Sequence, residues 1–383
     1  MKKGGNCGLL GEKLGHSRSP EIHRLFGDYG YRLFEKTPAE VREFLLHGDY
    51  DAINVTIPYK KTAFELCDRV SPVAAKLGNV NVVVRRDGGL FGDNTDAFGF
   101  KALLDSTGID VAGEKCTVLG SGGAAATVCA VLAEAGAAET VVVSRRGENN
   151  YSNLERHADT SLLVNTTPVG MYPDVGSSPV SLDVFPRLRA VIDLIYNPSP
   201  TKLLFEAEQR GIPAAGGLLM LVAQAWKASE YFGRRGCGNI YLYGPPGCGK
   251  STLGRALARA LDMSFTDLDA EICDAEAMTV PEIFAVRGEA EFRRMEKSHL
   301  KRISNRSGFV VALGGGALLD HESRAIAEST GGVLPIECTF EALVARTVRS
   351  GGRPLLDGDV ETRLRKLMEE RSGHYRSFLR CAR

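Results

Sequence analysis

The sequence lacks an excess of charge of either sign. Among its 383 residues, 47 lysines and arginines face 47 aspartates and glutamates, so the formal net charge is zero. Proteins that bind nucleic acids or acidic membrane surfaces through a long-range field normally carry a basic excess. We therefore expect no nucleic acid and no membrane as a partner, and any anionic ligand has to be held by positive charges that gather locally.

The nine cysteines lack any regular spacing. No Cys-x-x-Cys pair occurs, and no cysteine–histidine cluster has the spacing of zinc ligands. An odd, dispersed set is typical of reduced thiols in the cytoplasm, which is the location we expect. Residues 1–5 also lack the apolar core of a signal peptide.

A long uncharged run is the one feature that suggests a membrane span. Residues 116–133 contain no charged side chain, which is close to the length that a bilayer requires. The run contains a Gly-Ser-Gly-Gly turn at 120–123 and is rich in alanine rather than leucine. We interpret it as a buried strand, a glycine turn and a helix.

The length predicts more than one domain, because about 150 residues form a typical domain. Strand-like runs alternate with helical patterns, which predicts the α/β class. The basic, glycine-rich segment 234–238 is the best linker candidate, since a new βα pattern starts at residue 239. We expect a lobe over 1–98, a Rossmann-like lobe over 99–233 whose last helix returns to the first lobe, and a further α/β domain over 239–383. The expected elements include a helix over 39–46 and strands over 52–57, 80–85, 115–120 and 140–143.

A phosphate-binding loop is the strongest single motif. Residues 244–251 read GPPGCGKS, which fits the pattern G-x-x-x-x-G-K-[ST] between a strand and a helix. Backbone N–H groups of such a loop curl around phosphate oxygens, and the helix N-terminus adds its positive end. We expect Lys250 to reach the β- and γ-phosphates of ATP and Ser251 to bind Mg²⁺. The residues that we assign to ATP in this segment are Gly244, Gly247, Cys248, Gly249, Lys250, Ser251 and Thr252.

Further short motifs follow this loop. They are DLD at 267–269, GEAEFRRME at 288–296, GGG at 314–316, GRPLL at 352–356 and RSGHY at 371–375. Together with the phosphate-binding loop, they resemble shikimate kinase from about residue 239 onward. The resemblance implies a P-loop domain like that of the nucleoside-monophosphate kinases.

The resemblance to shikimate kinase also implies roles for single residues. Asp267 serves Mg²⁺ and catalysis beside Lys250, and Asp269 grips hydroxyls of the acceptor. Arg293 and Arg371 bind the acceptor carboxylate, for which the arginine fork is suited. The remaining implied residues are glycines that approach the acceptor and arginines near the nucleotide, namely Gly314, Gly315, Gly316, Arg349 and Arg353. Kinases of this family continue with another strand and helix, so we expect a domain shortened at its carboxyl end, with weaker nucleotide binding.

A second glycine turn follows the strand predicted at 115–120. It begins G-x-G like a dinucleotide-binding turn, although its third glycine comes early, and a purely structural turn is the alternative. At the end of the next strand, where an NAD enzyme places an acid on the ribose, two arginines stand instead, which favours the 2′-phosphate of NADP. The residues assigned to this cofactor are Gly120, Ser121, Gly122, Gly123, Ala124, Ser144, Arg145 and Arg146.

Another set of motifs lies in the first 233 residues. They are GHSRSPEIH at 15–23, NVTIPYK at 54–60, GDNTDAFG at 92–99, DLIYNP at 193–198 and GLLMLVAQA at 217–225. In combination they resemble shikimate dehydrogenase over roughly residues 6–233. The resemblance implies that the lobe over 1–98 binds the substrate and that the lobe over 99–233 binds NADP. The segment between Arg146 and Asn165 is short for this family, so we expect a looser contact with the adenosine side.

Reduction of a ketone by hydride leaves an alkoxide that needs a proton. The resemblance implies that Lys60, beside Asp96, orients the reacting oxygen and supplies that proton; the alternative for these two residues is a plain surface ion pair. The implied substrate-binding residues are Ser17, Ser19, Thr56, Asn81, Tyr196 and Gln224. Gly217 and Met220 are implied to face the nicotinamide. We expect His16 and His23 to be structural, because neither has a metal-binding partner at useful spacing.

Taken together, the motifs predict a bifunctional enzyme. Its first part is expected to reduce 3-dehydroshikimate to shikimate with NADPH, and its second part to phosphorylate shikimate with ATP and Mg²⁺. The product of the first reaction is the acceptor of the second, so two independent sets of motifs agree. Two alternatives stay open: a dehydrogenase that prefers quinate, and a kinase module that binds its ligands without turnover. We expect a monomer or a homodimer.

Overall fold

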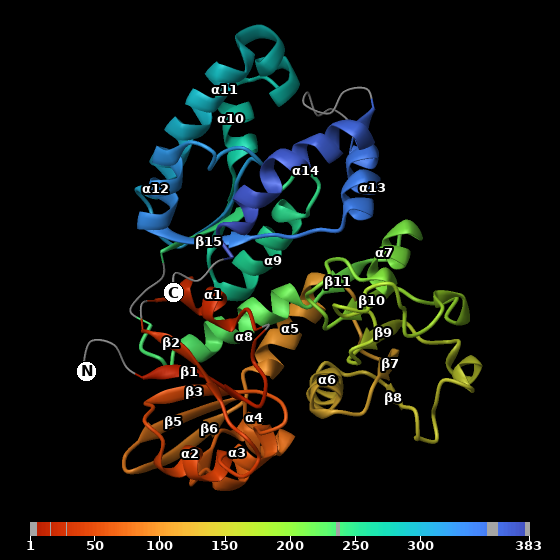
Figure 1. Cartoon of the computed structure of the whole chain (residues 1–383). Coiled ribbons are helices and arrows are strands. Elements are labelled where there is room, and N and C mark those ends of the chain that lie inside the picture. The colour runs from red at the N-terminus through yellow and green to blue at the C-terminus, as the bar shows by residue number, and fades with distance from the viewer. Residues whose placement is uncertain (1–5, 16, 28, 235–237, 351–358, 380–383) are drawn as a thin grey trace. The chain divides into compact units, whose positions relative to one another are not determined.

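The computed structural model describes residues 6–15, 17–27, 29–234, 238–350 and 359–379. The chain divides into two compact units, Met1–Arg235 and Gly236–Arg383, each with its own buried core (Figure 1). Both units combine β-sheets with helices, so the α/β class predicted from the sequence is confirmed.

The first unit begins with a mixed six-stranded sheet of order β2-β1-β3-β5-β6-β4. Strand β5 runs antiparallel to both of its neighbours, and the other pairs are parallel. Buried apolar side chains such as Leu10 and Ile53 pack with Leu45 and Ala63 of the covering helices. The strands are β1 Cys7–Gly11, β2 Tyr31–Glu35, β3 Ala52–Val55, β4 Arg69–Val70, β5 Val82–Arg86 and β6 Gly89–Asp93. The helices are α1 Ser19–Arg24, α2 Val41–His47, α3 Lys60–Leu66 and α4 Pro72–Leu77.

Element boundaries in this lobe differ slightly from the sequence expectations. The strand predicted at 52–57 ends at Val55, because the N–H of Tyr59 turns back to the carbonyl of Thr56 at 2.9 Å and starts the turn into α3. This early turn matters for function, since it places Lys60 at the first position of α3, directly after the end of a central strand.

The second sheet of this unit has five parallel strands in the order β11-β10-β9-β7-β8. Strands β9 and β10 are buried over their whole length, as apolar strands in the middle of a parallel sheet are. The strands are β7 Lys115–Leu119, β8 Glu139–Val143, β9 Leu162–Asn165, β10 Ala190–Asp193 and β11 Ala214–Gly216. The helices are α5 Asp96–Ser106, α6 Gly123–Glu134, α7 Lys202–Gln209 and α8 Leu218–Ser229, with short 3₁₀ helices η1 Leu154–His157 and η2 Leu182–Val184.

The uncharged run at 116–133 forms β7, a glycine turn and most of α6, as the sequence predicted. Among the described residues, none of the helices combines the length and the apolarity that crossing a bilayer requires. The crossover between β8 and β9 contains η1 as its only helix, so the short segment noted in the sequence is short in the fold as well.

Helices α5 and α8 cross very closely at Gly99. A Cβ atom at this position would lie 2.7 Å from the carbonyl oxygen of Met220 and 3.0 Å from the Cβ atom of Gln224. Only glycine allows this approach. The crossing carries the polar side chain of Gln224 to the end of α5 where Asp96 stands.

The second unit has a four-stranded parallel sheet of order β13-β14-β12-β15. Its core contains Tyr241, Tyr243, Ile283 and Val311. The strands are β12 Asn239–Tyr243, β13 Ser264–Asp267, β14 Phe309–Ala312 and β15 Gly331–Pro335. The helices are α9 Lys250–Leu261, α10 Leu268–Glu276, α11 Val280–Ser304, α12 His321–Thr330, α13 Phe340–Ser350 and α14 Val360–Arg376. Helix α11 is interrupted at Gly288, whose φ of +79° breaks the helical path.

Candidate active sites

Lys60 and Asp96 form an ion pair between Nζ and Oδ2 in the first unit. Each residue opens a helix, Lys60 in α3 and Asp96 in α5. Their side chains are 25% and 16% exposed, so the pair is half-buried and still open to a ligand. This burial distinguishes the pair from an ordinary surface ion pair.

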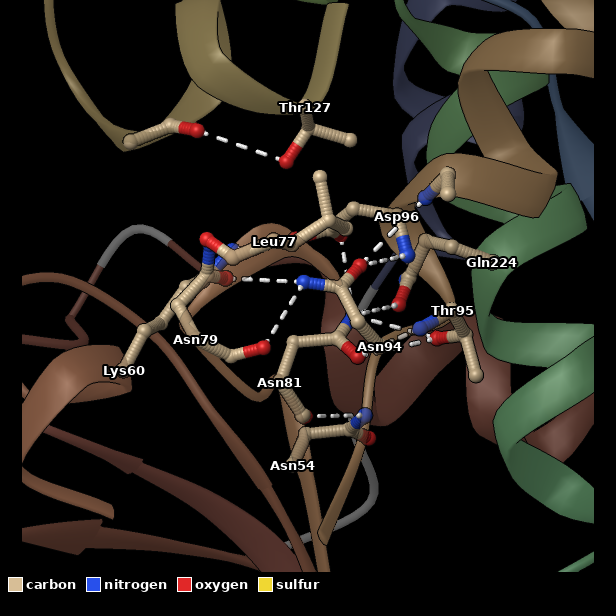
Figure 2. A network of polar contacts seen from close by, with 12 residues as sticks. Asn54, Lys60, Leu77, Asn79, Asn81, Asn94, Thr95, Asp96, Thr127 and Gln224 are labelled. Atoms are coloured by element: carbon tan, nitrogen blue, oxygen red, sulfur yellow. Dashed lines mark hydrogen bonds and ion pairs between the residues drawn. The ribbon is translucent and has the colours of Figure 1, made fainter. Parts of the chain in front are cut away.

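Asn81 holds the Lys60–Asp96 pair in place (Figure 2). Its Nδ2 lies 2.9 Å from Asp96 Oδ1, 3.0 Å from Thr95 Oγ1 and 3.5 Å from Gln224 Oε1. Its Oδ1 accepts the backbone N–H of Thr95 at 2.7 Å. The structure therefore brings four residues predicted from the sequence, Lys60, Asn81, Asp96 and Gln224, into one polar network.

Two asparagines that received no role from the sequence also belong to this network. Asn94 Oδ1 accepts the N–H of Asp96 at 3.0 Å, while its Nδ2 donates to Asn79 Oδ1 at 2.8 Å. Asn54 Nδ2 donates to the carbonyl oxygen of Asn81 at 3.2 Å. Asn54 and Asn94 lie inside the NVTIPYK and GDNTDAFG runs. The sequence therefore pointed to the two runs but not to these two residues within them.

Ser17 and Ser19 lie at the start of α1, where Ser17 Oγ accepts the N–H of Ser19 at 3.2 Å. Ser19 also contacts the hydroxyl of Tyr31, whose pKa is raised well above its ordinary value by burial. Tyr31 donates to Asn54 Oδ1 at 2.7 Å, and this bond connects the serines with the Asn81 network. Thr56 lies between β3 and Lys60, and its N–H donates to the carbonyl of Leu10 at 2.9 Å.

Tyr196 follows β10 and is partly buried. Burial raises the pKa of its phenol, and the guanidinium of Arg18 beside α1 acts in the opposite direction. Because Arg18 acts on its phenol, Tyr196 lies near Ser17 and Ser19. His23 is fully buried, which lowers its pKa to about 3 and keeps the ring neutral, in line with a structural role. No group of three or more His, Cys, Asp or Glu side chains that could hold a metal ion occurs in the part of the chain that the structure describes.

The glycine turn after β7 is shaped for an anion. Gly120 has a φ of +106°, and a Cβ atom there would lie 2.6 Å from Thr166 Oγ1. Gly122 caps α6 without any side-chain hydrogen bond, and the space beside Gly122 and Gly123 is open. Exposed N–H groups at a helix N-terminus bind phosphate groups, so the turn fits the pyrophosphate of a dinucleotide. Ser121 and Ala124 are exposed at the same turn.

Ser144, Arg145 and Arg146 follow β8 directly beside this turn. The N–H of Gly120 donates to the carbonyl oxygen of Val143 at 2.8 Å, which brings the ends of β7 and β8 together. Both arginines are exposed, and neither makes an ion pair with any described residue. Two available guanidinium groups at this place fit a 2′-phosphate.

Asp193 joins the loops that follow β9 and β10. Its carboxylate accepts from Asn165 Nδ2 at 3.0 Å, from the N–H of Ile195 at 3.1 Å and from Thr201 Oγ1 at 2.8 Å. Burial raises its pKa from the ordinary 3.8 to about 6. Gly217 begins α8 against these loops, where a Cβ atom would lie 2.0 Å from the carbonyl oxygen of Leu194, and Met220 lies in the first turn of the same helix.

In the second unit, the phosphate-binding loop encloses its own lysine. Lys250 Nζ donates to the carbonyl oxygens of Gly244 and Pro245, both at 2.9 Å. Gly247 and Gly249 have φ values of +80° and +92°, which only glycine adopts readily. Cys248 is buried in the loop, and Thr252 lies in the first turn of α9.

Ser251 and Asp267 supply the oxygen atoms that Mg²⁺ prefers. Ser251 Oγ donates to Asp267 Oδ2 at 2.5 Å, so the two ligands predicted from the sequence lie side by side. Asp267 also caps α10 by accepting the N–H groups of Asp269 and Ala270. A hydroxyl and a carboxylate next to a phosphate-binding lysine fit a hard cation bridging phosphate oxygens.

Arg293 lies against the glycines that end β14. A Cβ atom at Gly316 would lie 2.9 Å from Arg293 Cζ, so the glycine leaves room for the guanidinium. The guanidinium is engaged by Glu289 Oε1 at 2.9 Å and by Glu296 Oε2. Glu296 is 2% exposed, and burial raises its pKa to about 7 although Arg293 acts against this shift.

The other residues assigned to the acceptor surround the same glycines. A Cβ atom at Gly314 would lie 2.3 Å from Glu296 Oε1 and 2.9 Å from Asp269 Oδ1. The carbonyl of Gly315 accepts from the hydroxyl of Tyr375 at 2.8 Å, and Tyr375 in turn contacts Arg371. Sequence reasoning missed Glu296, which lies within the run 288–296 but was given no role.

The nucleotide side includes one arginine that the sequence analysis did not single out. Arg346 Nη1 donates to the carbonyl oxygen of Gly247 at 3.5 Å, from the middle of α13. Arg349 is exposed one turn further along this helix. Arg353 lies outside the described residues.

Two family models match this chain. One is the shikimate dehydrogenase substrate binding domain, over residues 9–83, and the other is shikimate kinase, over residues 246–381. Shikimate dehydrogenase (NADP(+)) of Clostridium perfringens is 38% identical over 244 residues, which cover 58% of this chain and 90% of that protein. The same enzyme of Symbiobacterium thermophilum is 37% identical over 266 residues, which cover 60% of this chain and 89% of that protein.

Solved structures show the same relationship. A chorismate mutase/shikimate 5-dehydrogenase fusion protein from Clostridium acetobutylicum is 37% identical, with a TM-score of 0.57 over 60% of this chain and 91% of that chain. Shikimate 5-dehydrogenase from Thermus thermophilus, solved with NADP(H) and shikimate, is 32% identical, with a TM-score of 0.54 over 67% of this chain and 99% of that chain.

A dehydrogenase fold with a lysine–aspartate pair is thus joined to a P-loop kinase fold. The chain belongs to the shikimate dehydrogenase family, and its second unit carries a shikimate kinase domain. The fusion of an oxidoreductase with a kinase, which the sequence predicted, is confirmed.

Proposed function

We propose that the chain catalyses two consecutive reactions: NADPH-dependent reduction of 3-dehydroshikimate to shikimate, and ATP-dependent phosphorylation of shikimate at its 3-hydroxyl in the presence of Mg²⁺. The Lys60–Asp96 pair carries the first assignment; Asn81 holds Asp96, and Gln224 contacts Asn81 in turn. The two units support a division into a substrate lobe over 1–98, an NADP lobe over 99–233 and a kinase domain over 239–383. We further propose a cytoplasmic enzyme that works as a monomer or homodimer.

In the first reaction, Lys60 provides the proton that the reduced carbonyl oxygen needs. The glycine turn at 120–123 would hold the pyrophosphate of NADPH, which would supply the hydride. Asp96 accepts from a substrate hydroxyl and from Lys60, and thereby orients the ammonium toward the reacting oxygen. Asn81 and Gln224 hold Asp96 and the remaining hydroxyls.

Hydroxyl groups hold the other end of the substrate. Ser17, Ser19, Thr56 and Tyr196 offer neutral O–H donors to the substrate carboxylate and ring hydroxyls. This arrangement suits a polyhydroxylated acid, because each of its oxygen atoms can accept from a hydroxyl donor.

In the second reaction, the phosphate-binding loop positions the γ-phosphate. Lys250 leaves the carbonyls of Gly244 and Pro245 for phosphate oxygens, and Ser251 with Asp267 holds the Mg²⁺ ion. Asp269 orients the attacking hydroxyl of shikimate, and Arg293 with Arg371 binds its carboxylate. The hydroxyl oxygen forms the new bond to phosphorus as the bond between phosphorus and the ADP oxygen breaks, and the hydroxyl proton is released to solvent.

A coupled assay tests the proposal on the full chain. With 3-dehydroshikimate, NADPH, ATP and Mg²⁺, we expect NADPH oxidation followed by ADP release and the appearance of shikimate 3-phosphate. Quinate and NAD⁺, offered in the reverse direction, test substrate and cofactor preference. NADPH oxidation without any shikimate 3-phosphate would reduce the second unit to a binding module, and a clear preference for quinate with NAD⁺ would overturn the first assignment.

A further inference from the structure

Tyr243 is the last residue of β12 and stands directly before the phosphate-binding loop. Its side chain is 0% exposed and belongs to the core of the second unit. The ring makes edge-on contacts with Tyr375, Phe378 and His374, with centroid distances of 5.1, 5.5 and 5.8 Å. These contacts hold the ring in one place between β12 and α14.

The hydroxyl group of Tyr243 is buried without a hydrogen-bond partner among the described residues. Such a group is rare, because an unpaired buried hydroxyl costs folding free energy. Tyr241 lies two residues earlier on the same face of β12 and is equally buried, yet its hydroxyl pairs with Thr330 Oγ1 at 2.7 Å and accepts from Asn239 Nδ2 at 3.2 Å. The strand therefore accommodates a fully paired tyrosine, and Tyr243 departs from that pattern.

The ring of Tyr243 packs at the acceptor glycines. Tyr375, whose ring centroid lies 5.1 Å from that of Tyr243, donates to the carbonyl oxygen of Gly315, and a Cβ atom at the neighbouring Gly314 would lie 2.3 Å from Glu296 Oε1. In line with these surroundings, burial is the main cause that raises the pKa of Tyr243; Tyr375 and Glu296 raise it further, and Arg371 and Arg293 lower it. Glu296 also has a buried oxygen without a partner, Oε1, while its Oε2 is held by Arg293. A donor and an acceptor thus both lack a partner in the same charged cluster.

Arg293 has to change partners when the acceptor binds. Its guanidinium is engaged by Glu289 and Glu296, whereas the proposed kinase reaction requires it to bind the carboxylate of shikimate. A buried carboxylate that loses its donor is costly, so Glu296 needs a replacement.

On the basis of the proposed kinase function, we propose that Tyr243 is a positioning residue of the acceptor site: its hydroxyl donates to the carboxylate of Glu296 when Arg293 turns to the carboxylate of the acceptor. Tyr243 does not touch the acceptor itself. It lowers the cost of freeing Arg293, and it thereby favours acceptor binding over the empty state.

Tyr243→Phe removes the hydroxyl alone, and Tyr241→Phe is its matched control. We expect Tyr243→Phe to raise the KM for shikimate about tenfold, as the loss of one hydrogen bond to a charged group does, while the kcat and the KM for ATP stay within about twofold of wild type. Its melting temperature should equal or exceed that of wild type. Tyr241→Phe should show the opposite pattern, with a lower melting temperature and an unchanged KM for shikimate.

Glu296→Leu, which removes both carboxylate oxygens at similar size, completes the test as a double-mutant cycle. If Tyr243 acts through Glu296, adding Tyr243→Phe to Glu296→Leu should change the KM for shikimate by less than about twofold. Additive effects would overturn the assignment of Glu296 as the partner. A KM for shikimate that Tyr243→Phe leaves at the wild-type value, or an equal rise for ATP, would overturn the role of Tyr243.

The failure of the underlying function is recognisable in the same experiment. If wild-type protein does not phosphorylate shikimate, the proposed kinase function fails, and the role of Tyr243 falls with it. If wild-type protein is active and Tyr243→Phe equals it, only the inference about Tyr243 fails. The melting temperature and the KM for ATP of each variant, measured in parallel, show whether its second unit is folded.

Discussion

The two sites hold their charged groups in different ways. In the first unit, neutral amide, hydroxyl and backbone N–H groups hold the carboxylate of Asp193, and Asp96 pairs with Lys60 through one oxygen and accepts from the amide of Asn81 with the other. In the second unit, Arg293 is engaged by two carboxylates and Lys250 by two carbonyl groups. A ligand can therefore enter the first site with its network intact, whereas an anionic ligand in the second site has to displace internal partners. The polar groups of the first site are thus in place before a ligand binds, whereas the cations of the second site have to exchange their internal partners for the ligand.

The two lysines should give the largest effects and test whether the sites are independent. Lys60→Ala should slow reduction of 3-dehydroshikimate about a thousandfold, since a general acid contributes rate factors of that order, and should leave the kinase unchanged. Lys250→Ala should do the reverse. NADPH absorbance and ADP release measure the two rates in one preparation. Comparable loss of both activities in either variant would contradict the independence of the two sites.

Asp193 tests the consequence of holding a buried carboxylate with neutral groups. Because its folded pKa of about 6 lies above the ordinary 3.8, the stability that it contributes is present at low pH and is lost as pH rises from about 4 through about 6. The shift corresponds to about 3 kcal/mol. Asp193→Asn should remove this part of the pH dependence of the unfolding free energy.

Urea unfolding followed by tryptophan fluorescence measures this effect in the first unit, because Trp226 of α8 is the only tryptophan of the chain. Asp105→Asn is the control, since Asp105 is a half-exposed partner of Lys101. An Asp193→Asn variant with the wild-type pH slope would show that Asp193 does not titrate in this range.

Arg293 tests the exchange of partners in the second unit. Arg293→Ala should raise the KM for shikimate about 30-fold through loss of a charge-assisted pair, with little change in the KM for ATP. Arg294→Ala is the matched control, because Arg294 is its neighbour in α11 and its side chain is 77% exposed. If the KM for ATP rises most, Arg293 belongs to the nucleotide site instead.

The smallest effect is expected from the exposed arginines after β8. Replacing Arg145 and Arg146 together by alanine should raise the KM for NADPH about tenfold and leave that for NADH unchanged, which narrows the preference between the two cofactors. Arg187→Ala removes an exposed charge elsewhere in the same unit and should change neither value. Equal losses with both cofactors would place the two arginines away from the 2′-phosphate.

The sequence predicted the parts of each site that lie in short, continuous motifs. The phosphate-binding loop needs Gly247 and Gly249 at positive φ and Lys250 after them, so its chemistry is visible in eight residues. Likewise, Lys60 and Asp96 each open a helix and lie within the runs NVTIPYK and GDNTDAFG. Local patterns also predicted the α/β class, because segments with the period of a strand alternate along the chain with segments that have the period of a helix.

The residues that the sequence did not single out act through contacts between distant segments. Asn54 matters because β3 lies beside β5 and brings it to Asn81. The sequence did single out Gln224, but its contact with Asn81 depends on Gly99, which lets α8 approach α5. Glu296 is one of several charged residues on α11, and only burial against Gly314 separates it from those that face solvent. The spacing of residues along the chain does not show which of these charged side chains is buried.

The lysine of the phosphate-binding loop also connects the two ends of that loop. Lys250 Nζ donates to the carbonyl oxygens of Gly244 and Pro245, so the residue that ends the loop is bonded to the residues that begin it. Phosphate oxygens that bind this ammonium group compete with the two carbonyl oxygens. An uncharged residue at this position would therefore remove a cation from the proposed ATP site and, at the same time, two hydrogen bonds that stabilise the loop.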